Sequence, residues 1–387
     1  MFRVFLRLGC TSFGGPVAHL GYFRAELVER RGWLDEAAYA DIVALCQFLP
    51  GPASSQVGVS LGILRAGLPG GLAAWCGFTL PSAFLLIAFA YGVAQAGDLS
   101  HAAWLHGLKT VAVAVVAQAV WGMARTLCPD RKRVTLAIAA AVLALAVPSA
   151  FGQVGAIAAG AAYGWGFIRE PPRITGQLGF TLSRRLAIAS LVLFAVLLLV
   201  LPLAATTGSH VLDLFARFYR SGSLVFGGGH VVLPLLQQSV VPPGWIGDDG
   251  FLAGYGAAQA VPGPLFTFAA YLGAAMAPLP NGWLGGLLCL VAIYLPSFLL
   301  LIGVLPFWDK LRQQGAVQAM LRGVNAAVVG ILLAALYTPV WTSGIQSARD
   351  FALGLAAFVL LVFWKAPPWL VVALGALSAS GLAYLSE

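Results

Sequence analysis

Two Pro-Gly-Pro tripeptides interrupt apolar stretches of this chain, at residues 50–52 and again at 262–264. Proline lacks an amide hydrogen and glycine accepts almost any backbone angle, so a continuous helix cannot pass through either tripeptide. A helix that restarts at Pro52 or Pro264 leaves the amide groups of its first turn free, and its dipole places about half a positive charge beside them. Hydroxyl donors follow in both turns, namely Ser54, Ser55 and Thr267. The pattern predicts a site for a small tetrahedral oxyanion, with simple capping by these hydroxyls as the alternative.

Further candidates are polar side chains inside or beside apolar stretches, where an ionisable group is expensive. Lys109 lies near one end of an apolar run and could attract a dianion or extend to the lipid headgroups, and Asn325 takes its place in the second half. His19 and His230 follow glycine-rich breaks and could carry a proton, with a structural role as the alternative. The remaining substrate-binding candidates lie at the breaks themselves: Gly14, Gly15, Gln47, Gly51, Pro52, Gly228, Gly229, Gln259, Gly263 and Pro264.

The composition is that of an integral membrane protein. Of the 387 residues, 60% are hydrophobic and only 9% are charged, and the mean hydropathy is +0.89, whereas soluble domains carry roughly 25% charged residues. A lipid bilayer is therefore an expected partner. A nucleic acid is not, because the basic residues form short clusters between apolar spans. No metal or cofactor is expected, since the five cysteines lack metal-ligand spacing and no Walker-type phosphate loop occurs.

The elements that must position these residues follow from the lengths of the apolar runs. Each arm around the first tripeptide is shorter than the roughly 20 apolar residues that a span needs, which indicates a re-entrant pair of half-helices. The expected elements of the first half are half-helices at 36–49 and 52–66, spans at 68–95 and 102–126, and shorter apolar runs at 134–148 and 151–168. A polar linker at 169–185 and one strongly apolar span at 186–204 follow.

The second half of the chain repeats the plan of the first. The paired motifs are Phe13-Gly14-Gly15 with Phe226-Gly227-Gly228, His19 with His230, Trp33 with Trp245, Gln47 with Gln259, Leu80-Pro81-Ser82 with Leu295-Pro296-Ser297, and Gly107 with Gly323. An ordered series of matches is typical of a duplication. It predicts a first repeat at 1–168, a linker with one transmembrane helix at 169–212, and a second repeat at 213–387.

Basic loops indicate that the two repeats have opposite orientations. Short loops rich in Lys and Arg face the cytoplasm, which assigns the loops at 24–36, 131–133 and 173–185 to that side and the loop at 96–101 to the other. In the second half the loop at 239–249 is acidic, whereas the loop that matches 96–101 carries Lys310 and Arg312. We therefore expect an all-α membrane protein with two inverted repeats, each containing a broken half-helix pair. Broken helices at matching positions of inverted repeats are typical of secondary transporters.

The motifs resemble those of the chromate ion transporter family over nearly the whole chain. The first-half resemblance rests on Phe13-Gly14-Gly15-Pro16 with His19, on Trp33-Leu34, on the stretch from Gln47 to Pro52, and on Leu80-Pro81-Ser82. Phe226-Gly227-Gly228-Gly229-His230 and Pro262-Gly263-Pro264 resemble the second domain of the family. The second half departs from the first in having Gly229 where Pro16 would be expected and Asn325 opposite Lys109.

The resemblance implies a long, two-domain bacterial protein that exports chromate across the inner (plasma) membrane and so confers chromate resistance. It also implies a secondary transporter that is driven by the membrane gradient. An enzyme is not expected, because the apolar spans carry no His-Glu-x-x-His or paired-aspartate pattern. A sulfate or other oxyanion transporter and an anion channel remain alternatives, because nothing in the residues distinguishes oxyanions of similar size and half-helices also line channels. A homodimer is one oligomeric state that the sequence leaves open.

Overall fold

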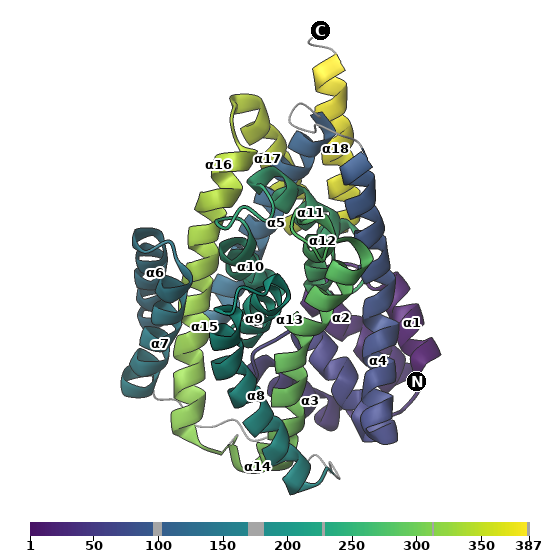
Figure 1. Ribbon diagram of the computed structural model, residues 1–387, viewed down its shortest axis with the longest axis vertical. Helices are drawn as coiled ribbons and strands as arrows, with labels where there is room; N and C mark the ends of the chain where they lie inside the picture. Colours follow the sequence, from purple (N-terminus) through teal and green to yellow (C-terminus); the bar gives the residue numbers. More distant parts are fainter. Residues whose placement is uncertain (96–102, 169–181, 227–228, 312, 385–387) are drawn as a thin grey trace.

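The computed structural model describes residues 1–95, 103–168, 182–226, 229–311 and 313–384, and every regular element among them is helical (Figure 1). The first part of the chain forms α1 (Phe2–Thr11), α2 (Gly15–Phe23), η1 (Arg24–Arg30), α3 (Glu36–Phe48), α4 (Ala53–Gln95), α5 (Ala103–Leu127), α6 (Arg131–Ala146) and α7 (Ala150–Phe167). A single helix, α8 (Arg184–Ala205), follows. The predicted linker and the loop at 96–101 lie largely outside the described residues.

The last part of the chain contains α9 (His210–Ser223), η2 (Gly229–Val231), α10 (Val232–Val240), α11 (Asp248–Ala260), η3 (Leu265–Thr267), α12 (Phe268–Ala275) and α13 (Gly282–Val304). It ends with η4 (Leu305–Phe307), α14 (Trp308–Leu311), α15 (Gly315–Ala335), η5 (Leu336–Trp341), α16 (Thr342–Gly344), α17 (Ala348–Val362) and α18 (Pro368–Tyr384).

Five of the described helical stretches are long and apolar enough to cross a membrane: 53–94, 104–127, 184–205, 282–307 and 315–344. They include the predicted spans of the first half and the linker span, so the prediction of an all-α, multi-pass membrane protein is confirmed. The predicted arms at 36–49 and 52–66 are helical as well. The second arm, however, joins the following span across a kink at Ala66 and Gly67, where Gly67 has a φ of 63°.

Both Pro-Gly-Pro tripeptides break helices, as predicted. At the first break α3 ends at Phe48, α4 begins at Ala53, and Gly51 between them has a φ of 123°. At the second break α11 ends at Ala260, and Gly263 has a φ of 100°. Glycine is the residue that adopts such angles without strain. The restarts differ, because the chain after Pro264 first makes the 3₁₀ turn η3.

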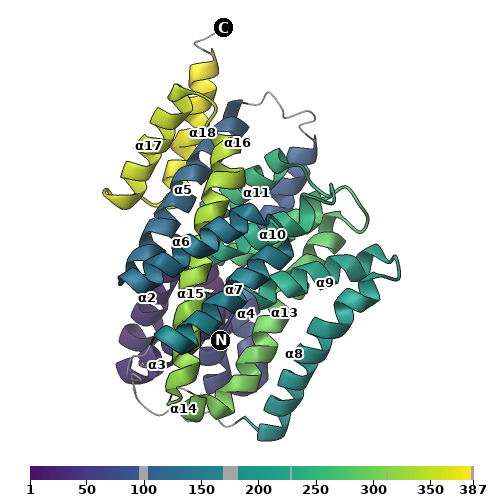
Figure 2. The same cartoon turned by 90° about the vertical axis from the view of Figure 1, so that its left-hand side faces the viewer.

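Each half contains a pair of consecutive helices that packs on a long helix of the other half. Helices α6 and α7 lie along α15, while α17 and α18 lie along α5 (Figure 2). The aligned glycines Gly107 and Gly323 explain how closely these helices approach. A Cβ atom on Gly323 would collide with the Gly160 carbonyl oxygen of α7, and one on Gly107 would collide with the Gly375 carbonyl oxygen of α18. Small residues allow such backbone contact between membrane helices.

The stretch of α4 that follows the kink packs antiparallel to α13. Near one end the Trp283 amide donates to the Tyr91 hydroxyl oxygen over 3.3 Å, and near the other the rings of Trp75 and Phe298 are 5.7 Å apart. These are the helices that carry the matched Leu-Pro-Ser motifs. The central core lies between α4, α11, α12 and α13 and contains fully buried aromatic side chains, Phe266 and Tyr294 among them.

Candidate functional site

A small cavity lies where the second Pro-Gly-Pro break meets the glycine-rich turn before α2. Its volume is about 10 Å³, roughly the room that one water molecule needs, and it is partly open. Its lining residues are Gly14, Gly15, His230, Ala258, Gln259, Val261, Gly263, Leu265 and Pro368. The cavity is therefore built from both halves of the chain, the first supplying the turn before α2 and the second supplying the rest.

Two backbone hydrogen bonds hold the breaks against the opposite halves. The Gly263 amide donates to the Ser12 carbonyl oxygen over 2.9 Å, and the Gly51 amide donates to the Val225 carbonyl oxygen over 2.6 Å. Ser12 and Val225 each immediately precede a Phe-Gly-Gly motif. Each break thus contacts the chain just before the glycine-rich motif of the other half, and the two contacts are reciprocal.

Helix α2 begins at the cavity, where Gly14 and Gly15 line the wall and Pro16 follows without an amide hydrogen. Gly14, the residue before the helix, has a φ of 98°, and no side chain caps the helix start. Amide groups in an uncapped first turn, together with the helix dipole, favour an anion. Pro368 lies at the start of α18 and also lines the cavity. Two helices from different halves therefore begin at this site.

The polar side chains of the cavity form a chain along α11. The Nδ1 atom of His230 is 2.9 Å from the hydroxyl oxygen of Tyr255, which precedes Gln259 by about one turn of α11. The Gln259 amide nitrogen is buried and has no hydrogen-bond partner among the described residues. Tyr255 was not predicted from the sequence. Its spacing of four residues from Gln259 on one helix face was the available signal.

The first break has packed side chains where the second has a cavity. The Gln56 amide nitrogen donates to the Pro50 carbonyl oxygen over 2.9 Å. The Ser54 hydroxyl lies 3.3 Å from His19 Nδ1, and the Ser55 hydroxyl lies 3.4 Å from the Tyr294 hydroxyl. All of these serine and glutamine side chains are buried. The predicted donors of the first break therefore serve contacts within the protein in this conformation.

The other predicted candidates are distributed as follows. Thr267 is fully buried and donates to the Pro264 carbonyl oxygen over 2.7 Å. Gly229 packs against Pro16, while Gly228 lies outside the described residues. Gln47 is exposed, unlike its counterpart Gln259, and Pro52 is buried. The structure thus brings Gly14, Gly15, His230, Gln259 and Gly263 together around the cavity.

Lys109 and Asn325 do not line the cavity. The Lys109 ammonium group is 2.6 Å from the Asp249 carboxylate, at the N-terminal end of α11. Ten helical residues at 1.5 Å each place this pair about 15 Å along α11 from Gln259. Asn325 lies in α15, and its side-chain oxygen is buried without a hydrogen-bond partner among the described residues.

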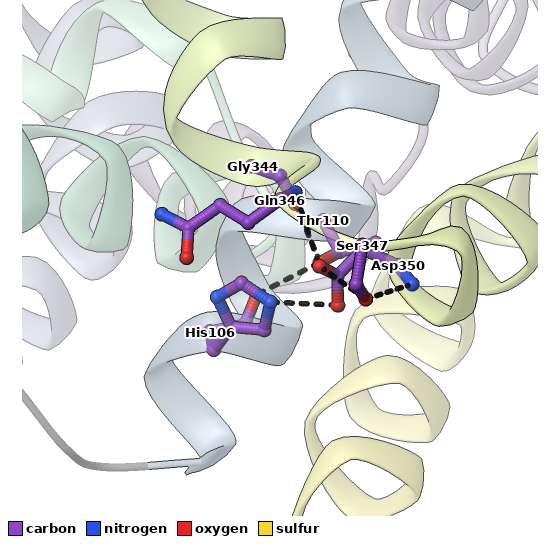
Figure 3. Close-up of polar contacts among 6 residues, drawn as sticks. All are labelled: His106, Thr110, Gly344, Gln346, Ser347 and Asp350. Atoms are coloured by element: carbon purple, nitrogen blue, oxygen red, sulfur yellow. Dashed lines mark hydrogen bonds and ion pairs between the residues drawn. The ribbon is translucent and has the colours of Figure 1, made fainter.

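A second polar cluster joins α5 to the start of α17 (Figure 3). His106 Nε2 is 2.7 Å from Asp350, the Ser347 hydroxyl donates to the same carboxylate over 2.9 Å, and the Thr110 hydroxyl donates to the Gly344 carbonyl oxygen over 3.0 Å. Burial alone would raise the pKa of Asp350, but its hydrogen bonds with His106 and Ser347 outweigh that effect and lower the pKa below its usual value. The cluster links the two halves away from the cavity.

These features define a multi-pass helical membrane protein with a small, partly open cavity between its two halves. The family profile described as "Chromate transporter" matches residues 1–165 and 212–380, so the chain belongs to the chromate transporter family. The predicted resemblance is thereby confirmed.

Individual relatives agree with this assignment. The chain is 30% identical to the "Chromate transport protein" of Pseudomonas aeruginosa, over 86% of this chain and 78% of that protein. It is 27% identical to the "Chromate transport protein" of Cupriavidus metallidurans, over 96% and 90% of the two chains. The "Uncharacterized transporter YwrA" of Bacillus subtilis is 30% identical, and 41% of this chain covers 90% of it. No solved structure gives a significant match.

Proposed function

We propose that this protein is a secondary transporter that exports chromate across the bacterial cytoplasmic membrane by alternating access, with the cavity at the second break as the anion site. The main observation behind the proposal is that residues from both halves of the chain line this one cavity. Helix starts from the two halves meet there with donor side chains from the second half, and none of the described residues of its lining is a carboxylate. A dianion is favoured by converging donors at helix N-termini.

Inverted repeats at 1–168 and 213–387 are part of the proposal. Reciprocal contacts support them, since an exchange of the two halves maps the Gly51–Val225 hydrogen bond onto the Gly263–Ser12 bond. The antiparallel packing of α4 and α13, which carry matching motifs, also supports opposite orientations. A relative of about half the length agrees with a repeat that can exist as a separate chain.

The side facing the cytoplasm follows from charge. Helix α8 begins with Arg184 and Arg185, and it starts beside α14, which contains Lys310, at the lower end of the molecule (Figure 1). Basic residues next to spans favour the cytoplasmic side. The lower end in Figure 1 is accordingly the cytoplasmic end, and export moves the anion upward in that view.

Chromate flux into and out of proteoliposomes tests the proposal. We expect saturable chromate counterflow that responds to an imposed pH or voltage gradient and that sulfate inhibits. Flux no higher than that of empty liposomes would refute chromate transport, and a conductance far above carrier turnover would identify an anion channel.

A matched pair of glutamine variants tests the location of the site. Gln259→Leu removes an unpartnered donor from the cavity, and the loss of a hydrogen bond to a charged group typically costs about 1.5–3 kcal/mol. We expect its KM for chromate to rise about tenfold or more. Gln47→Leu changes the exposed counterpart and should leave KM unchanged. Equal KM values in both variants would show that chromate does not bind at this cavity during transport.

A further inference from the structure

One turn of α5, in the first half, is joined to the second half by two carboxylates. His106 Nε2 is 2.7 Å from Asp350 in the first turn of α17 (Figure 3). The Lys109 ammonium group is 2.6 Å from Asp249 in the first turn of α11. Helix α5 begins near the upper end of the molecule, opposite to α14 (Figure 2). The two contacts lie toward that end, whereas Gln259 at the cavity is about 15 Å further along α11.

We propose that the His106–Asp350 and Lys109–Asp249 contacts form a latch that closes the outer end of the transport path and opens in each transport cycle. The inference deepens the proposed function and rests on it for alternating access and for the assignment of the upper end to the outside. The latch joins α5 to α11 and to α17, which continues into α18. Helices α11 and α18 carry cavity residues, so opening the latch allows two walls of the cavity to move away from α5.

The carboxylates of the latch keep stabilising partners when the contacts break. Asp350 also accepts from the Ser347 hydroxyl over 2.9 Å and from the Gln346 amide over 3.1 Å, both at the start of α17. Asp249 is 54% exposed and lies in the first turn of α11, where the helix dipole stabilises a negative charge. A broken ion pair is costly when it leaves a buried charge without a partner. Opening the latch leaves neither carboxylate in that condition.

The groups on α5 can also separate from the second half. The Thr110 hydroxyl is 3.0 Å from two carbonyl oxygens, that of Gly344 at the end of α16 and that of His106 one turn earlier in α5. A hydroxyl has one proton, so the bond within α5 can replace the bond to α16. The Lys109 ammonium group is buried in the closed latch, but its flexible stem can carry it to water. These contacts are therefore suited to repeated opening.

The matched positions of the other half cannot form the Lys109–Asp249 contact. The spacing of the paired motifs places Asn325 opposite Lys109 and Ala37 opposite Asp249. An amide and a methyl group make no ion pair. When two inverted repeats exchange conformations, a contact that exists at only one end stabilises one of the two states. The latch therefore favours the state that is closed to the outside, in which an exporter takes up its substrate from the cytoplasm.

Labelling of a cysteine in the cavity tests the latch without requiring transport. In a background without the native cysteines, Pro368→Cys is exposed to a membrane-impermeant thiol reagent added from the outside. Asp249→Asn and Asp350→Asn weaken the latch with little change in side-chain shape. Because hydrogen bonds to charged groups are among the stronger ones, we expect each variant to raise the labelling rate about tenfold.

Asp213→Asn is the matched control. Asp213 accepts from Arg217 Nε over 2.7 Å, but both residues lie in α9 of the second half. Its loss should leave the labelling rate unchanged even where it lowers the thermal stability. An equal increase in all three variants would indicate general loosening of the fold and overturn the latch. Unchanged labelling in the two latch variants, or full labelling of the protein with an intact latch, would overturn it as well.

A disulfide between α5 and α17 tests whether the latch must open. A Cβ atom on Gly354 of α17 would be 3.7 Å from Thr110 Cγ2 and would meet no atom closer than 3.4 Å. Thr110→Cys with Gly354→Cys therefore places two thiols close enough to bond. Oxidation should abolish chromate flux, and reduction should restore it. Flux that persists while mass spectrometry shows the disulfide would overturn the proposal. A wild type that moves no chromate would refute the proposed function, while the labelling rates would still decide whether the latch closes the cavity.

Discussion

Gly263 in the second break lies against Ser82 of α4, and a Cβ atom on the glycine would be 2.8 Å from the serine hydroxyl oxygen. The reciprocal pair is Gly51 and Ser297, where a Cβ atom on the glycine would be 2.5 Å from the serine Cβ. Both serines belong to the matched Leu-Pro-Ser motifs and donate to the carbonyl oxygen three residues earlier. The two breaks are thus fitted against equivalent turns of the opposite halves.

Gly263→Ala and Gly51→Ala should therefore impair chromate transport while the protein still reaches the membrane. Each glycine has a positive φ, and strain at such a position typically costs about 1–3 kcal/mol, which corresponds to a ten- to hundredfold loss of flux. We expect Gly51→Ala to be the more severe, because its clash is with a Cβ atom on a helix. Proteoliposome flux normalised to protein content is the measurement.

A second-site change separates the clash from the backbone strain. Ser82→Ala removes the hydroxyl oxygen nearest to the new methyl group and should restore part of the flux of Gly263→Ala. Wild-type flux in both single glycine variants would mean that the anion does not bind beside the paired breaks.

The inverted orientation of the repeats predicts the labelling of two new cysteines. In a background without the native cysteines, Lys132→Cys lies at the start of α6 and Asp248→Cys at the start of α11. A membrane-impermeant thiol reagent should label them from opposite sides of the membrane, the first from the cytoplasmic side. Labelling of both from one side would exclude the inverted arrangement.

Lys109 is expected to act on stability rather than on chromate affinity. Its ammonium group is held by Asp249 at the far end of α11 from the cavity. Lys109→Gln should lower the thermal stability, because the buried ammonium group loses its ion pair with Asp249. KM for chromate should change by less than about twofold, since the pair lies about 15 Å along α11 from Gln259. The charge-swapped double variant, Lys109→Asp with Asp249→Lys, serves as the control. A large increase in KM for Lys109→Gln would instead support a role in attracting the dianion.

Acid should weaken the polar contacts that connect α5 and α17 through His106 and Asp350. The folded protein lowers the pKa of Asp350, so the ionised carboxylate stabilises the folded state above the unfolded pKa of about 3.9. That contribution is lost as the pH falls from this value through the folded pKa. Asp350→Asn should reduce the free energy of unfolding by about 1–3 kcal/mol at neutral pH and flatten the pH dependence in the acid range. Thermal unfolding in detergent at a series of pH values measures the loss of stability and its pH dependence. If Asp350→Asn leaves the decrease of stability in acid unchanged, other carboxylates cause that decrease.

Local chemistry was enough to predict the breaks, because proline and glycine act on their own backbone. The same holds for the long apolar spans. The cavity was not predictable in this way, since its walls come from residues as distant as Gly14, Gln259 and Pro368. The matched glutamines show the difference most clearly. Gln47 and Gln259 have equivalent places in the sequence, but one is exposed and the other lines the cavity. The difference arises from how the rest of the chain packs around each side chain.

Lys365 lies in the turn between α17 and α18 and is the one non-glycine with a positive φ among the described residues, at 54°. The Ala366 amide donates to the Leu360 carbonyl oxygen over 2.9 Å across this turn, in which Lys365 adopts the left-handed angle two residues after the C-cap Phe363. Three residues later Pro368 lines the cavity, and the ring of Trp369 lies 6.3 Å from that of Phe13. Lys365 is exposed and lies three residues before Pro368 in the sequence, so its charge can be tested separately from its backbone angle.

Replacing Lys365 by glycine separates the charge from the fold. Lys365→Gly relieves the left-handed strain, which costs a non-glycine residue about 1–2 kcal/mol. A loss of transport in a variant of unchanged or higher thermal stability would therefore not come from misfolding. We expect KM for chromate to rise several-fold, more so at low ionic strength, where charges interact over longer distances. Lys365→Asn, which is neutral and tolerates the same backbone angle, should behave alike, and Lys365→Arg should retain the wild-type KM. A glycine variant that is more stable and has an unchanged KM at every salt concentration would show that the lysine only complements the C-terminal end of α17.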